Sequence, residues 1–154
     1  MKKLVIVRHG AYGPSEGLND IGKQQIRLLG EQLGNIISGD SIMIFTSTAE
    51  RAHQSAEILG KIFGVKNQLC EFLHSDCEHK EDHQKVLELV CTHKDSADVV
   101  ILVTHLEYGE NFPLYFAMRE FGEVHFSGFG IKQGQAWVID CQAKDMTLVA
   151  PDFR

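Results

Sequence analysis

The sequence predicts an α/β protein, folded as a three-layer α/β/α sandwich with a largely parallel central sheet. Two observations carry this prediction. Short apolar runs typical of buried strands occur at residues 4–7, 42–46 and 99–104. Segments between them place apolar residues at helical spacing. Alternating strands and helices pack into layers with parallel strand pairing. Because 154 residues fit one domain, we expect a single domain over residues 1–154.

The remaining elements follow from the same patterns. Helices are expected from about residue 20 to the Gly39-Asp40 pair, from the capping-box pattern Ser47-x-x-Glu50 to Gly64, and at residues 81–93 and 107–121. Further strands are expected at residues 66–72, as a short edge strand, at 124–131 in a hairpin with 136–140, and at 146–149.

Composition limits the partners and the location to be expected. The formal net charge of -6 argues against a nucleic-acid surface, because such surfaces are basic. No apolar run approaches the roughly 18 residues of a membrane span, and the apolar start stops too early for a signal peptide. The four cysteines form no CxxC pair and are expected to be reduced. We therefore expect a cytoplasmic protein that does not associate with membranes.

Polar residues follow three of the buried strands at the point where each strand ends. Arg8, His9 and Gly10 come at the end of the first strand, and His105 follows the strand at 99–104. Arg51 lies in the first turn of the helix after the second strand. Ligands of such sheets bind at the carboxyl ends of the strands. Two arginines and two histidines are therefore expected to converge on one edge of the sheet.

This set of side chains suits phosphoryl transfer. The transferred group carries negative charge on three oxygens, and guanidinium groups match phosphate oxygens with paired hydrogen bonds. Arg8 and Arg51 would supply two such groups. One imidazole can attack phosphorus and form a phosphohistidine, while the other, when protonated, donates to an oxygen that gains charge.

Three motifs resemble the signatures of the histidine phosphatase superfamily, also called phosphoglycerate mutase-like. They are Val7-Arg8-His9-Gly10, Ser47-x-x-x-Arg51-Ala52 and Val103-Thr104-His105. The segment at residues 18–25 also resembles the start of that family's first helix, and the resemblance extends from residue 4 to about residue 140. The short chain, the Thr104-His105-Leu106 sequence and the late segment up to Asp140 look most like the small SixA-like phosphohistidine phosphatases.

The resemblance implies a phosphoglycerate mutase-like fold and a role for each motif residue. It makes His9 the nucleophile, Arg8 and Arg51 the phosphate-binding arginines, and His105 the second histidine of the phosphate pocket. The other substrate-binding residues that it suggests are Gly10, Ser15, Asn19 and Leu106. Ser15 stands where many members have asparagine, and Ala11-Tyr12 replaces the usual residues after the first motif, so this loop leaves substrate selection open.

The proton donor of the family is an acid that the sequence does not single out. Glu71 is the first candidate, because it follows the short strand after Gly64. Asp76 and Glu107 are alternatives. SixA-like relatives manage without a clear donor, which suits an imidazole leaving group because imidazole departs more readily than an alkoxide. The lack of an evident acid therefore favours phosphohistidine or another substrate with a good leaving group.

Several residues between positions 70 and 83 have side chains that can ligate metals. They are Cys70, His74, Cys77, His79 and His83. Their spacing does not match the usual zinc patterns, and a polar loop followed by a helix start explains them as well. We therefore expect no metal site and no cofactor, with the two arginines neutralising the phosphate in place of a metal.

Three functions remain open on the sequence. The first is a phosphatase acting on a phosphohistidine protein or on a phosphorylated small molecule through a phosphohistidine intermediate. The second is a binding module for phosphorylated ligands that has the same fold and no turnover. The third is a metabolic enzyme of the phosphoglycerate mutase type. No insertion that would close over a sugar-acid phosphate is present, which argues against the third.

Overall fold

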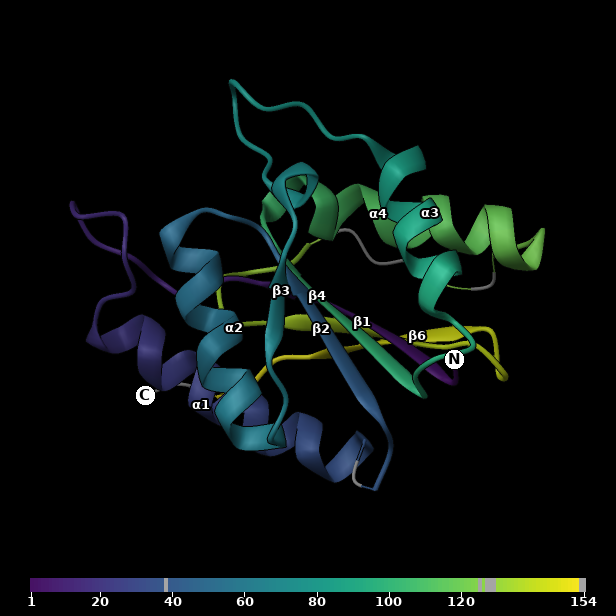
Figure 1. Ribbon diagram of the computed structural model, residues 1–154, viewed down its shortest axis with the longest axis horizontal. Helices are drawn as coiled ribbons and strands as arrows, with labels where there is room; N and C mark the ends of the chain where they lie inside the picture. The colour runs from purple at the N-terminus through teal and green to yellow at the C-terminus, as the bar shows by residue number, and fades with distance from the viewer. Residues whose placement is uncertain (38, 125, 127–129, 153–154) are drawn as a thin grey trace.

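A six-stranded sheet forms the middle layer of the described part of the chain (Figure 1). The computed structural model describes residues 1–37, 39–124, 126 and 130–152. The strand order is β3-β2-β4-β1-β5-β6. The strands are β1 (Lys3–Arg8), β2 (Ile42–Thr46), β3 (Asn67–Leu69), β4 (Val99–Thr104), β5 (Ala136–Asp140) and β6 (Asp145–Val149). The pairs β1–β4, β4–β2 and β2–β3 are parallel, whereas β5 runs antiparallel to both of its neighbours. The expected, largely parallel sheet is confirmed.

Two pairs of helices cover the two faces of the sheet (Figure 1). The helices α1 (Asp20–Ile37) and α2 (Glu50–Phe63) pack on one face, and α3 (His83–His93) and α4 (Leu106–Phe121) pack on the other. Alternate residues of β1 point to opposite cores: Val5 and Val7 face α1 and α2, while Leu4 and Ile6 face α3 and α4. Because side chains alternate across a strand, one continuous apolar run serves both layers of the sandwich.

The capping box expected at Ser47 and Glu50 is wrong. The residue before the first turn of α2 is Ala49, in an extended conformation and without a side-chain cap. Ser47 Oγ accepts a hydrogen bond from the Ala49 amide but also contacts His105 Nε2 at 2.8 Å, and Glu50 accepts from Gln54 instead of reaching back. The serine is held by its tertiary partner His105, and the cap lies at Ala49, two residues later than the pattern predicts.

The edge strand expected at 66–72 is shorter, because its partner β2 ends at Thr46. Leu69 is the last residue of β3 and pairs with Thr46. The next amide, of Cys70, donates to the Thr46 carbonyl at 2.8 Å. With no further strand to pair with, the chain turns into a short 3-10 helix, η1 (Glu71–Leu73).

The expected hairpin between 124–131 and 136–140 is not formed by the residues that the structure describes. Residues 124, 126, 130 and 131 are in no strand, and residues 125 and 127–129 lie outside the described part of the chain. Instead β5 forms a hairpin with β6, and β1 occupies its other edge. Both edges of β5 are therefore paired with other strands, which leaves no edge for residues 124–131. Within the described ranges, no helix has the length and apolarity needed to cross a membrane.

Candidate active site

The carboxyl ends of β1, β2 and β4 lie side by side and bring the predicted residues together. Arg8, the last residue of β1, pairs with Thr104 of β4, and Thr46 of β2 pairs with Val103. His9 and His105 therefore follow neighbouring parallel strands, and their rings lie 5.1 Å apart. The register of the ladder, which the buried side chains determine, thus places both imidazoles at one edge.

A cavity of about 170 Å³ opens at this edge and has two chemically distinct walls. The cationic wall consists of Arg8, His9, Arg51 and His105. The acidic wall consists of Ser75, Asp76 and Glu107. Tyr12 and Leu106 complete the lining. A larger hollow of about 430 Å³ lies beside Gln25, Lys132 and Pro151, but none of the predicted site residues lines it.

The two ring nitrogens of His9 have different partners. Its side chain is buried, and Nδ1 lies 2.8 Å from the carbonyl oxygen of Gly10. A carbonyl can only accept, so Nδ1 carries the proton and Nε2 carries the lone pair. Arg51 Nε donates to that lone pair at 3.2 Å. Burial, with Arg51 and Arg8 nearby, lowers the pKa of His9 to about 4, so the imidazole is neutral at neutral pH.

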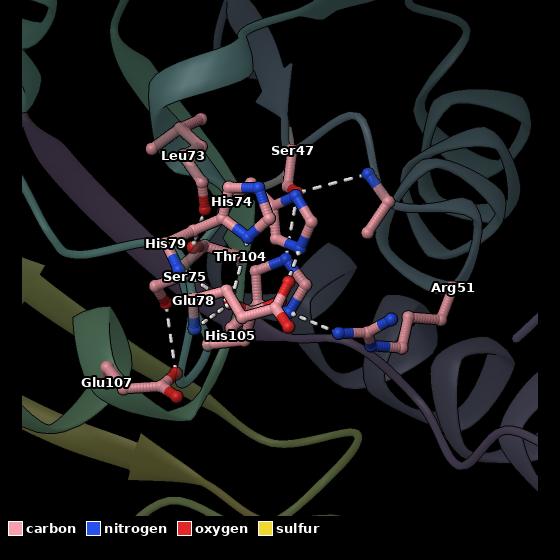
Figure 2. A network of polar contacts seen from close by, with 12 residues as sticks. Ser47, Arg51, Leu73, His74, Ser75, Glu78, His79, Thr104, His105 and Glu107 are labelled. Carbon is pink, nitrogen blue, oxygen red and sulfur yellow. Dashed lines mark hydrogen bonds and ion pairs between the residues drawn. The ribbon is translucent and has the colours of Figure 1, made fainter.

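The His105 ring contacts Ser47 and Arg51 (Figure 2), and its two nitrogens have the opposite roles to those of His9. Its Nδ1 lies 3.4 Å from Arg51 Nη2, and its Nε2 lies 2.8 Å from Ser47 Oγ. Because a guanidinium only donates, Nδ1 is the acceptor and Nε2 carries the proton. Burial, together with His9 and Arg51, lowers the pKa of His105 to about 2. A phosphate dianion in the cavity would oppose this shift and favour the protonated, donating form.

The two arginines retain hydrogen-bonding capacity for an anion. Arg51 bridges His9 and His105, and its guanidinium lies over the Tyr12 ring at 4.7 Å. Arg8 donates from Nη1 to the Ile131 carbonyl at 2.9 Å, while its buried Nε has no hydrogen-bond partner among the described residues. Burial lowers the pKa of Arg8 from its ordinary value. A buried, unpaired guanidinium donor is costly, and an anion in the cavity would relieve that cost.

The loop after β1 is held by contacts that the sequence did not suggest. The Gly10 amide donates to Ser55 Oγ at 3.1 Å, and Ser55 Oγ donates to the Arg51 carbonyl at 2.7 Å. A Cβ on Gly10 would meet the Gly22 carbonyl oxygen at 2.6 Å, so only glycine fits there. The available signal was a serine on an otherwise apolar helix face, between Ala52 and Ala56.

The acidic candidates divide between the cavity and the surface. Glu71 is exposed in the 3-10 helix and does not line the cavity, whereas Asp76 and Glu107 do. Asp76 Oδ1 accepts hydrogen bonds from the Glu78 and His79 amides and from His79 Nδ1. These bonds, that of the His79 side chain first, hold the pKa of Asp76 well below its usual range. Glu107 Oε2 accepts from buried Ser75 Oγ at 2.9 Å.

The suggested substrate-binding residues also occupy different positions. Leu106 lines the cavity, and Gly10 adjoins His9. Ser15 is exposed in a turn outside the lining. Asn19 is exposed as well, and its Oδ1 accepts from the Gly22 amide at 2.8 Å, in the first turn of α1. The geometry of Asn19 is that of a helix cap.

The residues with metal-ligating side chains are not gathered into one group. His74 and His79 come together with Asp76, and their ligating atoms lie within 4.8 Å of one another. His83 instead packs among Tyr108, Phe112 and Tyr115. All four cysteines are free, Cys70 being buried and Cys77 exposed.

Comparison with known proteins places this geometry in a family. Residues 4–88 match the model of the histidine phosphatase superfamily (branch 1). A candidate phosphohistidine phosphatase SixA from Nakamurella multipartitia has a TM-score of 0.71 at 16% identity, covering 97% of this chain and 96% of that one. The protein histidine phosphatase SixA in complex with tungstate has a TM-score of 0.67 at 17% identity, covering 96% and 94%.

Structures named for other substrates are also similar. A mycobacterial glucosyl-3-phosphoglycerate phosphatase has a TM-score of 0.60 at 17% identity, covering 97% of this chain and 98% of that one. No curated protein sequence matches the chain. At these identities the solved structures establish the fold, the expected phosphoglycerate mutase-like sandwich, while the family follows from the matched model.

Proposed function

Because the chain belongs to the histidine phosphatase superfamily, we propose that it is a phosphatase that hydrolyses phosphohistidine through a phosphorylated His9. The observation that carries the proposal is the orientation of His9. Its Nδ1 proton is committed to the Gly10 carbonyl, so the Nε2 lone pair points to the cavity, where it accepts a hydrogen bond from Arg51 Nε that a bound phosphoryl group would replace. A neutral imidazole with its lone pair beside two guanidinium groups is arranged to attack a bound phosphoryl group.

The reaction follows in two displacements. His9 Nε2 attacks phosphorus in line, and an N–P bond forms while the bond to the leaving group breaks and the electron pair goes to that group. A water molecule then attacks the phosphohistidine, releases inorganic phosphate and returns the lone pair to Nε2. Arg8 and Arg51 neutralise the phosphoryl oxygens in both steps, and His105 donates to an oxygen as charge grows on it.

The size of the cavity supports a protein phosphohistidine as substrate. A volume of about 170 Å³ is smaller than pockets that enclose drug-sized molecules, which start at about 300 Å³. The phosphoryl group would enter, and the remainder of the substrate would stay outside. A phosphorylated histidine on a partner protein meets this requirement. The partner protein and a reducing, cytoplasmic setting for the four free cysteines stay predictions.

The acidic wall supports the same choice. Asp76 is held in its ionised form by its hydrogen bonds and is a poor proton donor. Glu107 also lines the cavity and accepts one hydrogen bond there, from Ser75 Oγ, so we take it as the less committed of the two acids. An imidazole leaving group needs less help from a donor than an alkoxide does, because it departs more readily. A site with two arginines, and with Glu107 as an acid that already accepts a hydrogen bond, therefore suits phosphohistidine better than an alkyl phosphate.

The decisive experiment measures phosphate release from a phosphohistidine protein, an aryl phosphate and sugar-acid phosphates. His9→Ala should lower turnover by about 10⁴-fold or more while phosphate analogues still bind. His53→Ala, at a partly exposed histidine on α2 outside the cavity lining, is the matched control and should have no effect. Turnover near the wild-type rate in His9→Ala would refute the mechanism. Binding without turnover by the wild type would favour a binding module, and an isomerised substrate would favour a mutase.

A further inference from the structure

Three side chains beside the cavity form a cluster that the phosphatase mechanism does not use. His74 Nε2 lies 3.2 Å from Asp76 Oδ2, and His79 Nδ1 lies 2.8 Å from Asp76 Oδ1. The two imidazole rings stack with their centroids 4.2 Å apart and an angle of 14° between their planes. All three residues belong to the loop between η1 and α3, and Figure 2 shows both histidines above His105.

The separations within the cluster are close to those around a small transition-metal ion, and a turn of one stacked ring would direct both nitrogen lone pairs to one point. Bonds of about 2.0–2.2 Å in a tetrahedral site place neighbouring donor atoms about 3.3 Å apart. The two pairs that include Asp76 are already at 3.2 and 2.8 Å, and no two donor atoms are more than 4.8 Å apart. Two imidazoles and one carboxylate form a ligand set typical of Zn²⁺, whereas Mg²⁺ and Ca²⁺ prefer oxygen donors alone.

A second observation points to a missing ligand. The Nε2 atom of His74 is buried, and it lies 3.2 Å from Asp76 Oδ2 in an ion-pair contact without a well-formed hydrogen bond. Buried nitrogen atoms in this state are uncommon. Asp76 is positioned independently of the histidine rings, since the amides of Glu78 and His79 donate to its Oδ1 at 2.8 and 2.7 Å. Such outer hydrogen bonds orient a metal-ligating carboxylate.

The cluster also contacts the phosphate cavity. Asp76 is part of the acidic wall, and the His74 ring stacks on His105 with 4.9 Å between centroids. The negative charge of Asp76 opposes a phosphate dianion in the cavity, and a bound dication would reverse this local charge. Metal and phosphoryl group would then each favour the binding of the other, because coupling between two sites is reciprocal.

We propose that His74, Asp76 and His79 bind a single Zn²⁺ ion that tightens the binding of phosphoryl groups in the neighbouring cavity. The ion takes the place of the proton that His79 Nδ1 shares with Asp76, and at least one coordination position remains open to water. The metal is a modulator of the site, so turnover continues without it. The metal site stands on the cluster alone, whereas its coupling to the cavity rests on the proposed function.

The metal site is tested by titrating the full-length protein with Zn²⁺ alone, by calorimetry, in a buffer free of phosphate. We expect one site. His79→Ala and Asp76→Asn should each weaken it by about tenfold or more, since even outer partners of metal ligands contribute about 10–100-fold. His53→Ala removes a partly exposed histidine that also has a carboxylate nearby, Glu57 at 3.4 Å, and should leave the affinity unchanged. Absence of zinc binding, or equal affinity in all four proteins, would overturn the proposal.

The coupling is tested with phenylphosphonate. The enzyme cannot cleave its P–C bond, so the probe binds without being turned over. Its dissociation constant should fall by about fivefold or more when zinc replaces a chelator, and His79→Ala should abolish this change. Zinc binding with an unchanged phosphonate affinity would refute the coupling and leave the metal site standing. Failure of phosphonate to bind even without zinc would instead count against the proposed phosphatase function.

Discussion

The cationic and acidic walls of the cavity are built by different means. The cationic wall comes from the ends of β1 and β4 and the start of α2, and its two histidines are almost fully buried. Backbone ladders hold it: the His9 amide donates to the Thr104 carbonyl, and the Ser47 amide donates to the Val103 carbonyl. Its geometry is therefore as rigid as the sheet itself.

The acidic wall is held mainly by side chains. Ser75 and Asp76 belong to the loop between η1 and α3, and Glu107 reaches them through a single hydrogen bond from Ser75. The Asp76 side chain keeps 34% of its surface exposed. The comparison indicates a division of labour. Under the proposed function, the cationic wall binds the phosphoryl group, and the acidic wall contacts the leaving group and the proposed zinc site.

The largest loss of activity from a change in the cationic wall is expected at Arg51, which contacts both histidines of that wall. Arg51→Ala should lower kcat/KM by about 10³-fold, the scale typical of losing one donor to a developing negative charge. Arg119→Ala is the matched control, because its guanidinium also lies over a tyrosine ring, that of Tyr115 at 4.9 Å, but outside the cavity lining. Steady-state kinetics would measure both, and a small loss in Arg51→Ala would contradict the assigned role.

Burial of the cationic wall also predicts a pH effect on stability. The folded-state pKa of His9 is about 4 against an ordinary value of 6.5, so the unfolded chain takes up this proton first as the pH falls. Stability that is complete above pH 6.5 should therefore decline by about 3 kcal/mol as the pH falls to about 4. Denaturant unfolding of the wild type and of His9→Asn should show this difference between pH 7 and pH 4, and parallel pH curves would contradict it.

The acidic wall should matter according to the leaving group. Glu107→Gln should lower turnover of an alkyl phosphate by about 10²-fold, the usual contribution of a general acid, and affect phosphohistidine much less. Glu110→Gln provides the control, because Glu110 also acts on Arg8 electrostatically but lies outside the cavity lining. Equal losses on both substrates would show that Glu107 orders the site and does not donate a proton.

The smallest effect concerns Asn19, which belongs to neither wall. Asn19→Ala removes the cap of the Gly22 amide and should cost about 1 kcal/mol of stability with little change in kcat/KM. Ser15 lies in the same loop and is exposed like Asn19, but it is outside the lining and does not cap the Gly22 amide. Ser15→Ala should therefore change neither the stability nor kcat/KM. Thermal unfolding and steady-state kinetics would separate the two roles, and a raised KM in Asn19→Ala would restore it as a substrate-binding residue.

The amino-acid sequence alone determined the cationic wall. The apolar runs of β1, β2 and β4 are continuous, so the pattern of apolar residues by itself indicated that these strands are buried and where each one ends. Arg8, His9 and His105 lie within one residue of those ends, and Arg51 lies in the first turn of α2, so local sequence order was enough to group them. Parallel pairing then left little freedom for their relative positions.

Only the tertiary structure decided the acidic wall and the elements around it. Ser75 and Asp76 follow no strand end, and their partner Glu107 is more than thirty residues away in the sequence, so their meeting depends on how α4 packs. The same reason explains why Ser47 serves His105 in place of a capping box, and why Glu71 lies outside the cavity. Periodicity encodes which face of an element is buried, but contacts between polar loops depend on distances that only the packed chain defines.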